Sequence, residues 1–251
     1  MIDACALDYG HGGFVGPVYQ TAGKRYRFTD HAFEAYEGKI NRAVYRMIRH
    51  LMARTCADPL LVDVVQGGLE RRAGLPLQYD VSLQSRVEWA NQAWEAYGAP
   101  LVSIHTNAAG NADHGRSKSP RGISVFTSPG DTESDRIASR LVAAFKVMEK
   151  DGGLPVRPGD WSDGDPDHEA RFYLLTKTRG PAVLVEGGWF TNWQDVSVLN
   201  THRGLDRLAA GYVLGLVGED VRTPEAELDE SWRPLDVRTG YLPRPGGVHG
   251  A

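Results

Sequence analysis

Three short apolar runs in this chain each end at an ionisable residue followed by small residues, and this repeated arrangement limits the fold more than any other feature. The runs occur in IDACALDYGHGG, PLVSIHTNAAGN and PAVLVEGGWFTN. Short stretches rich in Val, Leu and Ile with glycine at their ends are typical of buried β-strands. Residues 60–65 and 122–128 have the same apolar character and are two further candidate strands.

Amphipathic helical patterns separate these runs. Apolar residues recur at three- and four-residue spacing in residues 40–51, 83–97, 137–148 and 205–216, and such stripes are the buried faces of helices. Strands that alternate with helices form a largely parallel sheet that is covered on both faces. We therefore predict an α/β fold with a mostly parallel, twisted sheet of about five or six strands and helices on both faces.

The length of 251 residues suits one large domain with a small appendage. Residues 1–218 are predicted to form that domain. Residues 219–251 are a Pro/Gly-rich tail, which we expect to be extended or disordered. Residues 14–31, 67–80 and 152–169 are expected to be long loops, and loops of this length inside a compact domain are often functional.

Composition argues against several classes of protein. The net charge of −4 gives no electrostatic footprint for nucleic acid. The two cysteines, Cys5 and Cys56, are too few for a disulfide framework or a Cys/His zinc site. No run approaches the roughly 18 apolar residues of a membrane span. The N-terminus lacks the basic and apolar regions of a secretory signal, so we expect none.

Ionisable residues stand where the predicted strands end. Ligands bind outside the carboxyl ends of the strands in parallel α/β sheets, and His11, His105 and Glu186 lie at three such ends. Glu37 stands at the start of the first predicted helix. Two histidines and a carboxylate are a common ligand set for catalytic zinc, with water in the fourth position. A further carboxylate beside that water can act as a general base.

Each of these residues also has a simpler interpretation. A single His in a glycine-rich loop is more often a hydrogen-bonded surface residue than a metal ligand. Glu186 is harder to explain in that way, because burying an unpaired carboxylate costs free energy. The convergence of three strand ends on one edge of a sheet is therefore the stronger argument for a site.

Four motifs together resemble the zinc-dependent N-acetylmuramoyl-L-alanine amidases of the amidase-3 type. They are LDYGHGG, YEGKINRAV, VSIHTNAAGN and VLVEGGWFTN, in the family's order. VSLQSRVEWAN is also similar to the family's helix after its second strand. The family's opening motif is DPGHGG, so Tyr9 here replaces a proline. The family's Arg-Asp pair after the second strand has no clear match in VVQGGLERRAG.

The resemblance implies an enzyme that hydrolyses the amide between N-acetylmuramic acid and L-alanine in peptidoglycan. It implies that residues 1–218 are the catalytic domain, that His11, Glu37 and His105 bind Zn²⁺, and that Glu186 is the catalytic proton carrier. The expected partner is the muramyl peptide of the cell wall, with no nucleic acid and no membrane span.

Two assignments stay open at this point. Glu34 precedes Glu37 by nearly one helical turn and would face a similar direction. We prefer Glu37 because it stands directly before the apolar stripe. Asp8, Asn107 and Asn192 are candidates for holding the histidines or the substrate, but Asp and Asn are also habitual turn formers.

Aromatic and basic residues could contribute to substrate binding, although we favour packing for the former and solvated surface charge for the latter. These candidates are Trp161, Phe172, Trp189, Trp193, Arg25, Arg27, Arg71 and Arg72.

Two rival functions fit the same scaffold: a zinc peptidase of different amide specificity, and a non-catalytic wall-binding or regulatory protein. The complete set of four site residues speaks against the second rival. Because no secretory signal is expected, we predict cytoplasmic synthesis with action at the cell wall or periplasm, as in a phage or prophage endolysin.

Overall fold

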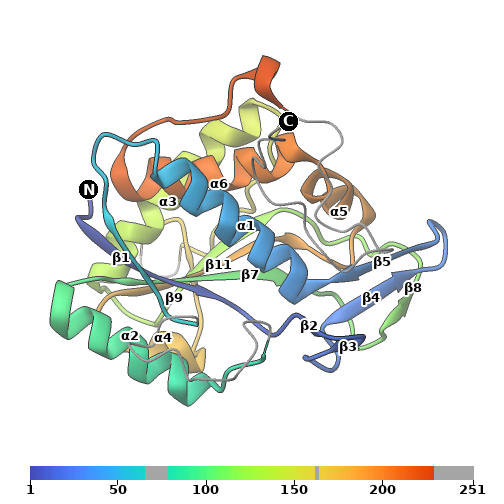
Figure 1. The fold of residues 1–251 in the computed structure, drawn as a ribbon, viewed down its shortest axis with the longest axis horizontal. Coiled ribbons are helices and arrows are strands. Elements are labelled where there is room, and N and C mark those ends of the chain that lie inside the picture. Colours follow the sequence, from blue (N-terminus) through green and yellow to red (C-terminus); the bar gives the residue numbers. More distant parts are fainter. Residues whose placement is uncertain (66–78, 162–163, 229–251) are drawn as a thin grey trace, which may run out of the picture.

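A six-stranded sheet forms the centre of the molecule in the computed structural model, which describes residues 1–65, 79–161 and 164–228. The strands follow the order β10-β9-β11-β7-β1-β6, of which β9, β11, β7 and β1 are labelled in Figure 1. β6, β1, β7 and β11 are parallel, while β9 runs antiparallel to β11. Their bounds are β1 Ala4–Tyr9, β6 Leu60–Asp63, β7 Leu101–Asn107, β9 Ile123–Thr127, β10 His168–Glu169 and β11 Ala182–Trp189.

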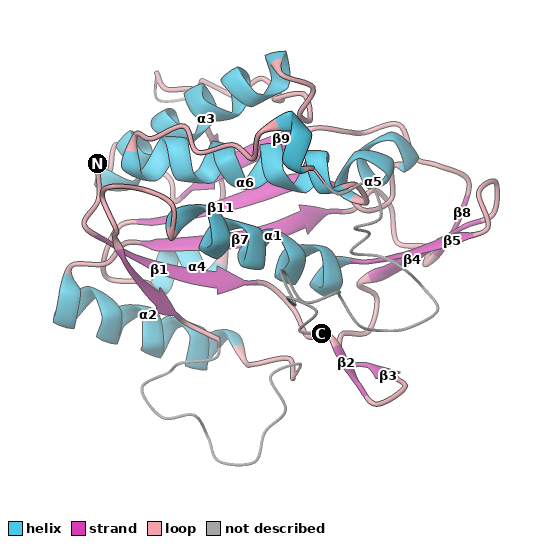
Figure 2. Ribbon diagram, turned by 45° about the horizontal axis from the view of Figure 1, so that its top comes forward, coloured by secondary structure: helices cyan, strands magenta, loops and turns pink. Residues whose placement is uncertain are grey.

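Helices cover both faces of this sheet, which confirms the predicted α/β fold. α1, α3, α5 and α6 lie on one face, and α2 and α4 lie on the other (Figure 2). Alternate residues of the strands feed two separate apolar clusters: Leu7 and Val183 join the α1, α3 and α6 side, whereas Ala6 and Leu184 join the α2 and α4 side. The helices are α1 Glu37–Met52, α2 Leu83–Tyr97, α3 Glu133–Lys150, α4 Tyr173–Lys177, α5 Trp193–Leu199 and α6 His202–Val217.

The prediction that residues 14–31 form a long loop is wrong in part, because this segment contains strands. β2 and β3 form one hairpin, and β4, β5 and β8 form a three-stranded sheet. The alternation in β4 explains this: Tyr26 and Phe28 are buried while Arg25 and Arg27 are exposed. Phe28 packs edge-on against Trp193 of α5, 5.6 Å between ring centroids. The bounds are β2 Phe14–Val15, β3 Val18–Tyr19, β4 Arg25–Phe28, β5 Phe33–Tyr36 and β8 His114–Gly115.

The other two predicted loops are described incompletely. Residues 67–78 of the second lie outside the described residues. The third contains β10, which extends the central sheet beside β9, and residues 162–163 lie outside the described part.

The start of the predicted tail packs against the domain. A single 3₁₀ turn, Glu225–Glu227, follows α6. Asp206 of α6 accepts a hydrogen bond from the backbone of Thr223 at 3.0 Å, and Glu219 accepts hydrogen bonds from the backbone of Cys56 and Ala57. Residues 229–251 lie outside the described residues. None of the described helices has the length and apolar character needed to span a membrane.

Candidate metal centre and active site

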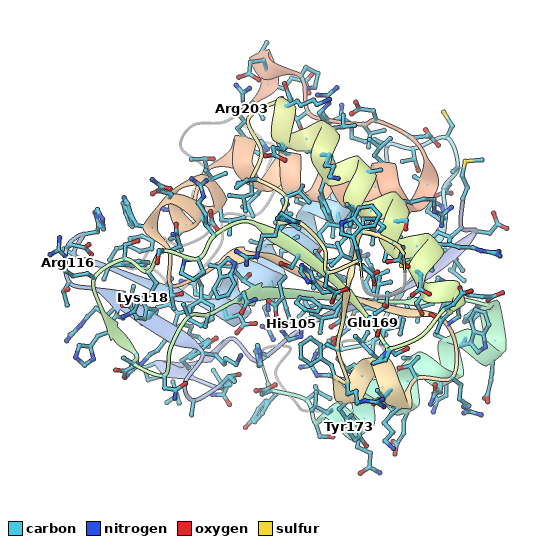
Figure 3. The ribbon with its side chains drawn as sticks, turned by 180° about the vertical axis from the view of Figure 1, so that it is seen from behind. His105, Arg116, Lys118, Glu169, Tyr173 and Arg203 are labelled. Carbon is cyan, nitrogen blue, oxygen red and sulfur yellow. The ribbon has the colours of Figure 1, made fainter. Side chains whose placement is uncertain are left out.

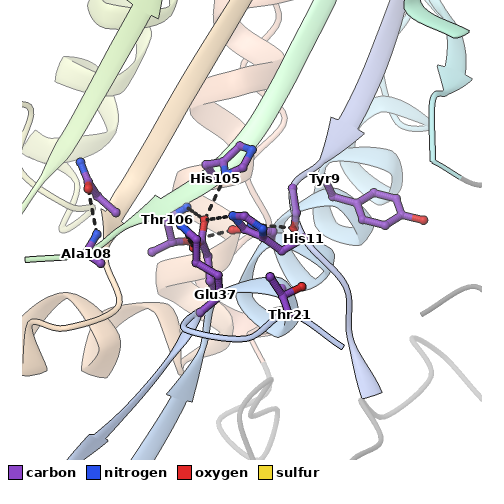
Figure 4. A network of polar contacts seen from close by, with 12 residues as sticks. Tyr9, His11, Thr21, Glu37, His105, Thr106 and Ala108 are labelled. Atoms are coloured by element: carbon purple, nitrogen blue, oxygen red, sulfur yellow. Dashed lines mark hydrogen bonds and ion pairs between the residues drawn. The ribbon is translucent and has the colours of Figure 1, made fainter. Parts of the chain in front are cut away.

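His11, Glu37 and His105 meet at the carboxyl edge of the sheet, as the sequence predicts (Figure 4). Glu37 Oε1 lies 3.0 Å from His105 Nδ1 and 3.2 Å from His11 Nε2. The potential ligand atoms of the three residues all lie within 4.8 Å of one another. The two imidazole rings meet edge to face, 4.9 Å between centroids. Three segments that are distant in sequence thus converge on one point.

Close backbone approaches allow this convergence. His11 follows β1 with φ of 67°, a left-handed conformation that is uncommon for a residue other than glycine and costs strain energy. A Cβ atom on Gly10 would lie 2.1 Å from Cε1 of His105. A Cβ atom on Gly38 would lie 1.8 Å from the carbonyl oxygen of Gly12. Both positions need glycine because no side chain fits between the strand end, the histidine loop and the start of α1.

Asn41 fixes α1 to two of the strands. Its Nδ2 donates to the carbonyl of Gly10 at 3.0 Å, and its Oδ1 accepts from Thr106 Oγ1 at 2.8 Å. Both side chains are buried. One turn of helix after Glu37, Asn41 therefore holds the helix start at a fixed distance from the segments that carry the two histidines.

The surroundings of Glu37 favour its charged form. Burial by itself would raise the pKa of this carboxyl, but the hydrogen bond from His105 and the close contact with His11 outweigh burial and hold the pKa well below its ordinary value. Burial would likewise lower the pKa of His105, yet the contact with Glu37 raises it overall. Glu37 is thus an anion under ordinary conditions, which suits a metal ligand.

Glu186 lies beside this group on the neighbouring strand. It is paired with His105 in the register of β11 and β7. Its Oε2 atom is buried and has no hydrogen-bond partner among the described residues. Burial raises the pKa of Glu186 to about 7; the charge of His105 opposes this rise and the charge of Glu37 adds to it. A carboxyl with these properties can both accept and release a proton near neutral pH.

The three converging residues fit a zinc ion. Two imidazoles and one carboxylate are the donor set of open catalytic zinc sites. His11 Nε2 is buried and forms no hydrogen bond within the described chain, although it lies close to Glu37 Oε1. A buried nitrogen left without a hydrogen bond costs free energy unless something binds it. A cation held between these atoms would remove that cost.

Glu37 is the carboxylate of this group, and Glu34 is not. Glu34 lies in β5, before the helix starts, so the helical spacing that suggested a shared direction does not apply. Its carboxylate accepts a hydrogen bond from the Tyr36 hydroxyl and lines a small pocket of about 170 Å³ with Arg25 and Arg27.

Asp8 has a different partner from the one predicted. It is fully buried and forms an ion pair with Arg86 of α2, and it accepts a hydrogen bond from Ser103 Oγ at 2.6 Å. Arg86 also donates to the carbonyl of Tyr9 at 3.0 Å. Burial would raise the pKa of Asp8, but the charge of Arg86 is foremost among the effects that lower it overall. Asp8 thus fastens the end of β1 to α2 rather than accepting a hydrogen bond from an imidazole.

The two asparagine candidates also have local partners. Asn107 Oδ1 accepts from the backbone of Ala108 at 2.8 Å. Asn192 begins α5 as its N-cap, accepting from the backbone of Asp195 at 3.1 Å, and its amide donates to the carbonyl of Lys118. These contacts are those of turn-forming and helix-capping residues, and none of them joins an asparagine to a histidine.

The other candidates lie mostly in packing or surface positions. Trp193 stacks on His31, 4.0 Å between centroids, inside the aromatic contact between α5 and the β4–β5 hairpin. Arg25 pairs with Asp113 in an exposed contact. Trp161 and Phe172 are exposed, and Trp189 lies under the guanidinium of Arg157. Arg71 and Arg72 lie outside the described residues.

Sequence reasoning missed two charged residues near the centre. Arg86 was part of a recognised motif, but nothing in its spacing assigned it to Asp8. Lys24 places its Nζ atom 3.1 Å from Glu37 Oε2. No periodic pattern marks Lys24, because the segment that carries it was expected to be a loop.

Comparisons with known proteins identify a family for this chain. The family Amidase_3, N-acetylmuramoyl-L-alanine amidase, matches residues 5–217. Curated proteins compared by sequence give no match.

Solved structures of three amidases share the fold. An N-acetylmuramoyl-L-alanine amidase from Clostridium difficile 630 is 21% identical, with a TM-score of 0.61, covering 85% of this chain and 95% of that one. The catalytic domain of CwlV, such an amidase from Bacillus (Paenibacillus) polymyxa var. colistinus, is 20% identical, with a TM-score of 0.60 and coverage of 85% and 96%. An N-acetylmuramyl-L-alanine amidase from Mycobacterium smegmatis is 17% identical, with a TM-score of 0.60 and coverage of 87% and 98%.

The family match extends over most of the chain and includes all four residues that the structure brings together. The chain therefore belongs to the Amidase_3 family of N-acetylmuramoyl-L-alanine amidases.

Proposed function

We propose that this protein is a zinc-dependent amidase that hydrolyses the bond between the lactyl group of N-acetylmuramic acid and L-alanine in peptidoglycan. The single observation that carries the proposal is the meeting of His11, Glu37 and His105 beside Glu186, whose buried Oε2 has no hydrogen-bond partner among the described residues. The family match supplies the substrate class.

The ligands would be His11 and His105 through their ring nitrogens and Glu37 through its carboxylate. When bound, a zinc ion would supply Lewis acidity, which acidifies water and polarises an amide carbonyl. Glu37 would contribute the one negative charge of the ligand set, and Asn41 would keep its helix in place.

Glu186 would move the proton. Its carboxylate takes a proton from the attacking water and then delivers it to the amine nitrogen of L-alanine, which leaves as a neutral amine. The raised pKa of about 7 suits both halves of this transfer. Its place opposite His105 in the strand register keeps it next to the ligand set throughout.

Product analysis on purified peptidoglycan tests the proposal. We expect new L-alanine amino termini and intact glycan strands. New reducing ends, or free amino groups only on residues further along the peptide, would instead identify a glycosidase or a peptidase. Metal analysis of the same preparation should find about one zinc per chain, and a His105→Ala variant should lose both zinc and turnover.

The cellular setting stays a prediction. An endolysin that reaches the wall from the cytoplasm should lyse producing cells only after their membrane is permeabilised. Lysis during expression without permeabilisation would argue for an export route instead.

A further inference from the structure

Lys24 is a charged residue of the site that the mechanism above leaves without a role. Its ammonium nitrogen lies 3.1 Å from Glu37 Oε2, and its side chain is 38% exposed. The ammonium is therefore next to a proposed ligand and still open to solvent.

The backbone around Lys24 is held by the residues next to the ligands. The amide of Glu37 donates to the carbonyl of Lys24 at 3.0 Å, and the hydroxyl of Tyr19 donates to the same carbonyl at 3.1 Å. Tyr19 in turn accepts from the amide of Gly38 at 2.9 Å. The Lys24 side chain thus starts from a fixed point at the helix start, and its place beside Glu37 follows from the fold.

A second attachment joins the same segment to the histidine loop. The amide of Gly12, next to His11, donates to Thr21 Oγ1 at 2.8 Å, and Thr21 donates to Asp80 Oδ2 at 2.5 Å. Residues 19–24 are therefore anchored at both ligand-bearing segments. Two other cations, Arg116 and Lys118, lie well to one side of His105 (Figure 3).

Glu37 is the carboxylate that pairs with Lys24, and a bound cation would compete for it. Asp8 and Asp80 both pair with Arg86 instead. A divalent cation held through Glu37 would share the charge of that carboxylate and repel the ammonium of Lys24. Such a group is stabilised when an anion reaches it from solution.

We propose that Lys24 is a specificity-determining residue that binds a free carboxylate of the stem peptide on the amine side of the scissile amide. The inference rests on the proposed function. In a muramyl peptide, the carboxylates belong to the peptide, while the acyl side is the neutral sugar and its lactyl group. An ammonium beside the metal ligands would therefore select the direction in which substrate lies and favour acidic stem peptides over amidated ones.

The test compares two muramyl dipeptides that differ in one group, a free carboxylate or a carboxamide on the second residue. The variants are Lys24→Met and Lys24→Arg, with Arg25→Gln as the matched control, because Arg25 is the neighbouring cation and pairs with Asp113 instead. Readouts are KM and kcat for each substrate and the zinc content of each protein. Calorimetry on zinc-loaded Glu186→Gln protein, with and without Lys24→Met, measures binding alone.

We expect Lys24→Met to raise KM for the acid at least about tenfold, as the loss of a charge-assisted hydrogen bond does. The KM for the amide and both kcat values should change less than about twofold. Lys24→Arg should keep the preference for the acid, Arg25→Gln should behave as the unmodified protein, and all should retain zinc.

Three results would overturn the inference. These are an equal loss for acid and amide, a fall in kcat with KM unchanged, or a loss of zinc in Lys24→Met. The first result would show that Lys24 does not recognise a carboxylate. The second would show that Lys24 acts on the transition state and not on substrate binding. The third would show that Lys24 is needed to keep Glu37 in place for the metal. If the unmodified protein cleaves neither substrate, the proposed function fails, while the calorimetric comparison of acid and amide still decides the role of Lys24.

Discussion

Two carboxyl groups beside His105 have pKa values that their surroundings shift in opposite directions. A hydrogen bond from His105 and the close contact with His11 hold the pKa of Glu37 well below its usual value, whereas burial raises the pKa of Glu186 to about 7. Such a separation assigns roles: the group that stays ionised can bind a metal, and the group near neutrality can carry a proton.

Replacing Glu186 with Gln should remove the proton carrier and leave the ligand set intact. We expect kcat to fall by about 10²–10⁴-fold, the usual contribution of general acid–base catalysis, while zinc content stays the same. Steady-state kinetics and metal analysis on the same preparation check this. Full turnover by a zinc-loaded Glu186→Gln protein would contradict the assignment.

The buried pair of Asp8 and Arg86 should dominate the stability of the strand end. Asp8→Asn removes the fully buried anion that pairs with Arg86 and leaves it only the partly exposed Asp80 as a charged partner, so we expect a loss of about 3–5 kcal/mol in the free energy of unfolding at pH 7. Urea titration measures this loss. Glu95→Gln is the control, because it breaks an exposed pair with Arg179 and should cost less than about 1 kcal/mol.

The same pair predicts a pH dependence. The pKa of Asp8 lies below its unfolded value of 3.8. Its stabilising effect is therefore complete well above pH 4 and is lost as the pH falls through the lower, folded-state pKa. The stability difference between the unmodified protein and Asp8→Asn should shrink steadily below pH 4, and a difference that stays constant down to pH 2 would contradict the assigned pairing.

Elements bring the site together by close contact at their ends. β1 is followed by a glycine-flanked histidine, α1 begins with Glu37, and β7 and β11 place His105 and Glu186 side by side. Lys24, just before β4, accepts a hydrogen bond at its carbonyl from the amide of Glu37. Each element contributes one or two residues, so a small shift of any element changes the distances between ligands.

Gly10→Ala tests this dependence on close contact. The added Cβ would overlap the His105 ring, so we expect the ring to move and zinc affinity to fall by at least about tenfold, comparable to disturbing a group that orients a ligand. Competition with a chromogenic chelator measures affinity. Gly23→Ala is the control, because no atom lies within 4 Å of a Cβ there, and it should keep zinc despite the strain of its positive φ of 74°.

At the scale of the whole molecule, the candidate site lies at the carboxyl ends of the parallel strands, in a sheet that helices cover on both faces (Figure 2). The three residues proposed as metal ligands come from the loop after β1, from α1 and from β7, whose positions relative to one another exist only in the folded chain. A metal that binds the folded state alone must therefore stabilise the whole domain.

Zinc should raise the melting temperature accordingly. At a free concentration about 100 times Kd the gain is about 2.7 kcal/mol, which corresponds to a shift of about 5–10 °C for a domain of this size. Glu186→Gln should show the same shift, and His105→Ala should show none. A chelator should reverse the shift in differential scanning fluorimetry, and an equal shift for His105→Ala would contradict the ligand assignment.

The sequence by itself determined the layers of this protein and which residues lie at the strand ends of its candidate site. Apolar periodicity depends on local spacing, so the alternating strands and helices and the position of His11, His105 and Glu186 at strand ends could be predicted. The family motifs added Glu37. Helical spacing wrongly suggested that the side chains of Glu34 and Glu37 face a similar direction. Glu34 lies in strand β5, before the helix begins, so that spacing does not apply to it.

Only the tertiary structure decided which of these residues touch. The pairing of Asp8 with Arg86, the placement of Lys24 beside Glu37, and the use of Asn192 as a helix cap all join residues through contacts that no periodic pattern encodes. The hairpin of residues 25–36 is the clearest case, since its strands are short and are stabilised by packing against Trp193, far along the chain. Contacts of this kind depend on the three-dimensional arrangement of the elements, so they become visible only once the chain has folded.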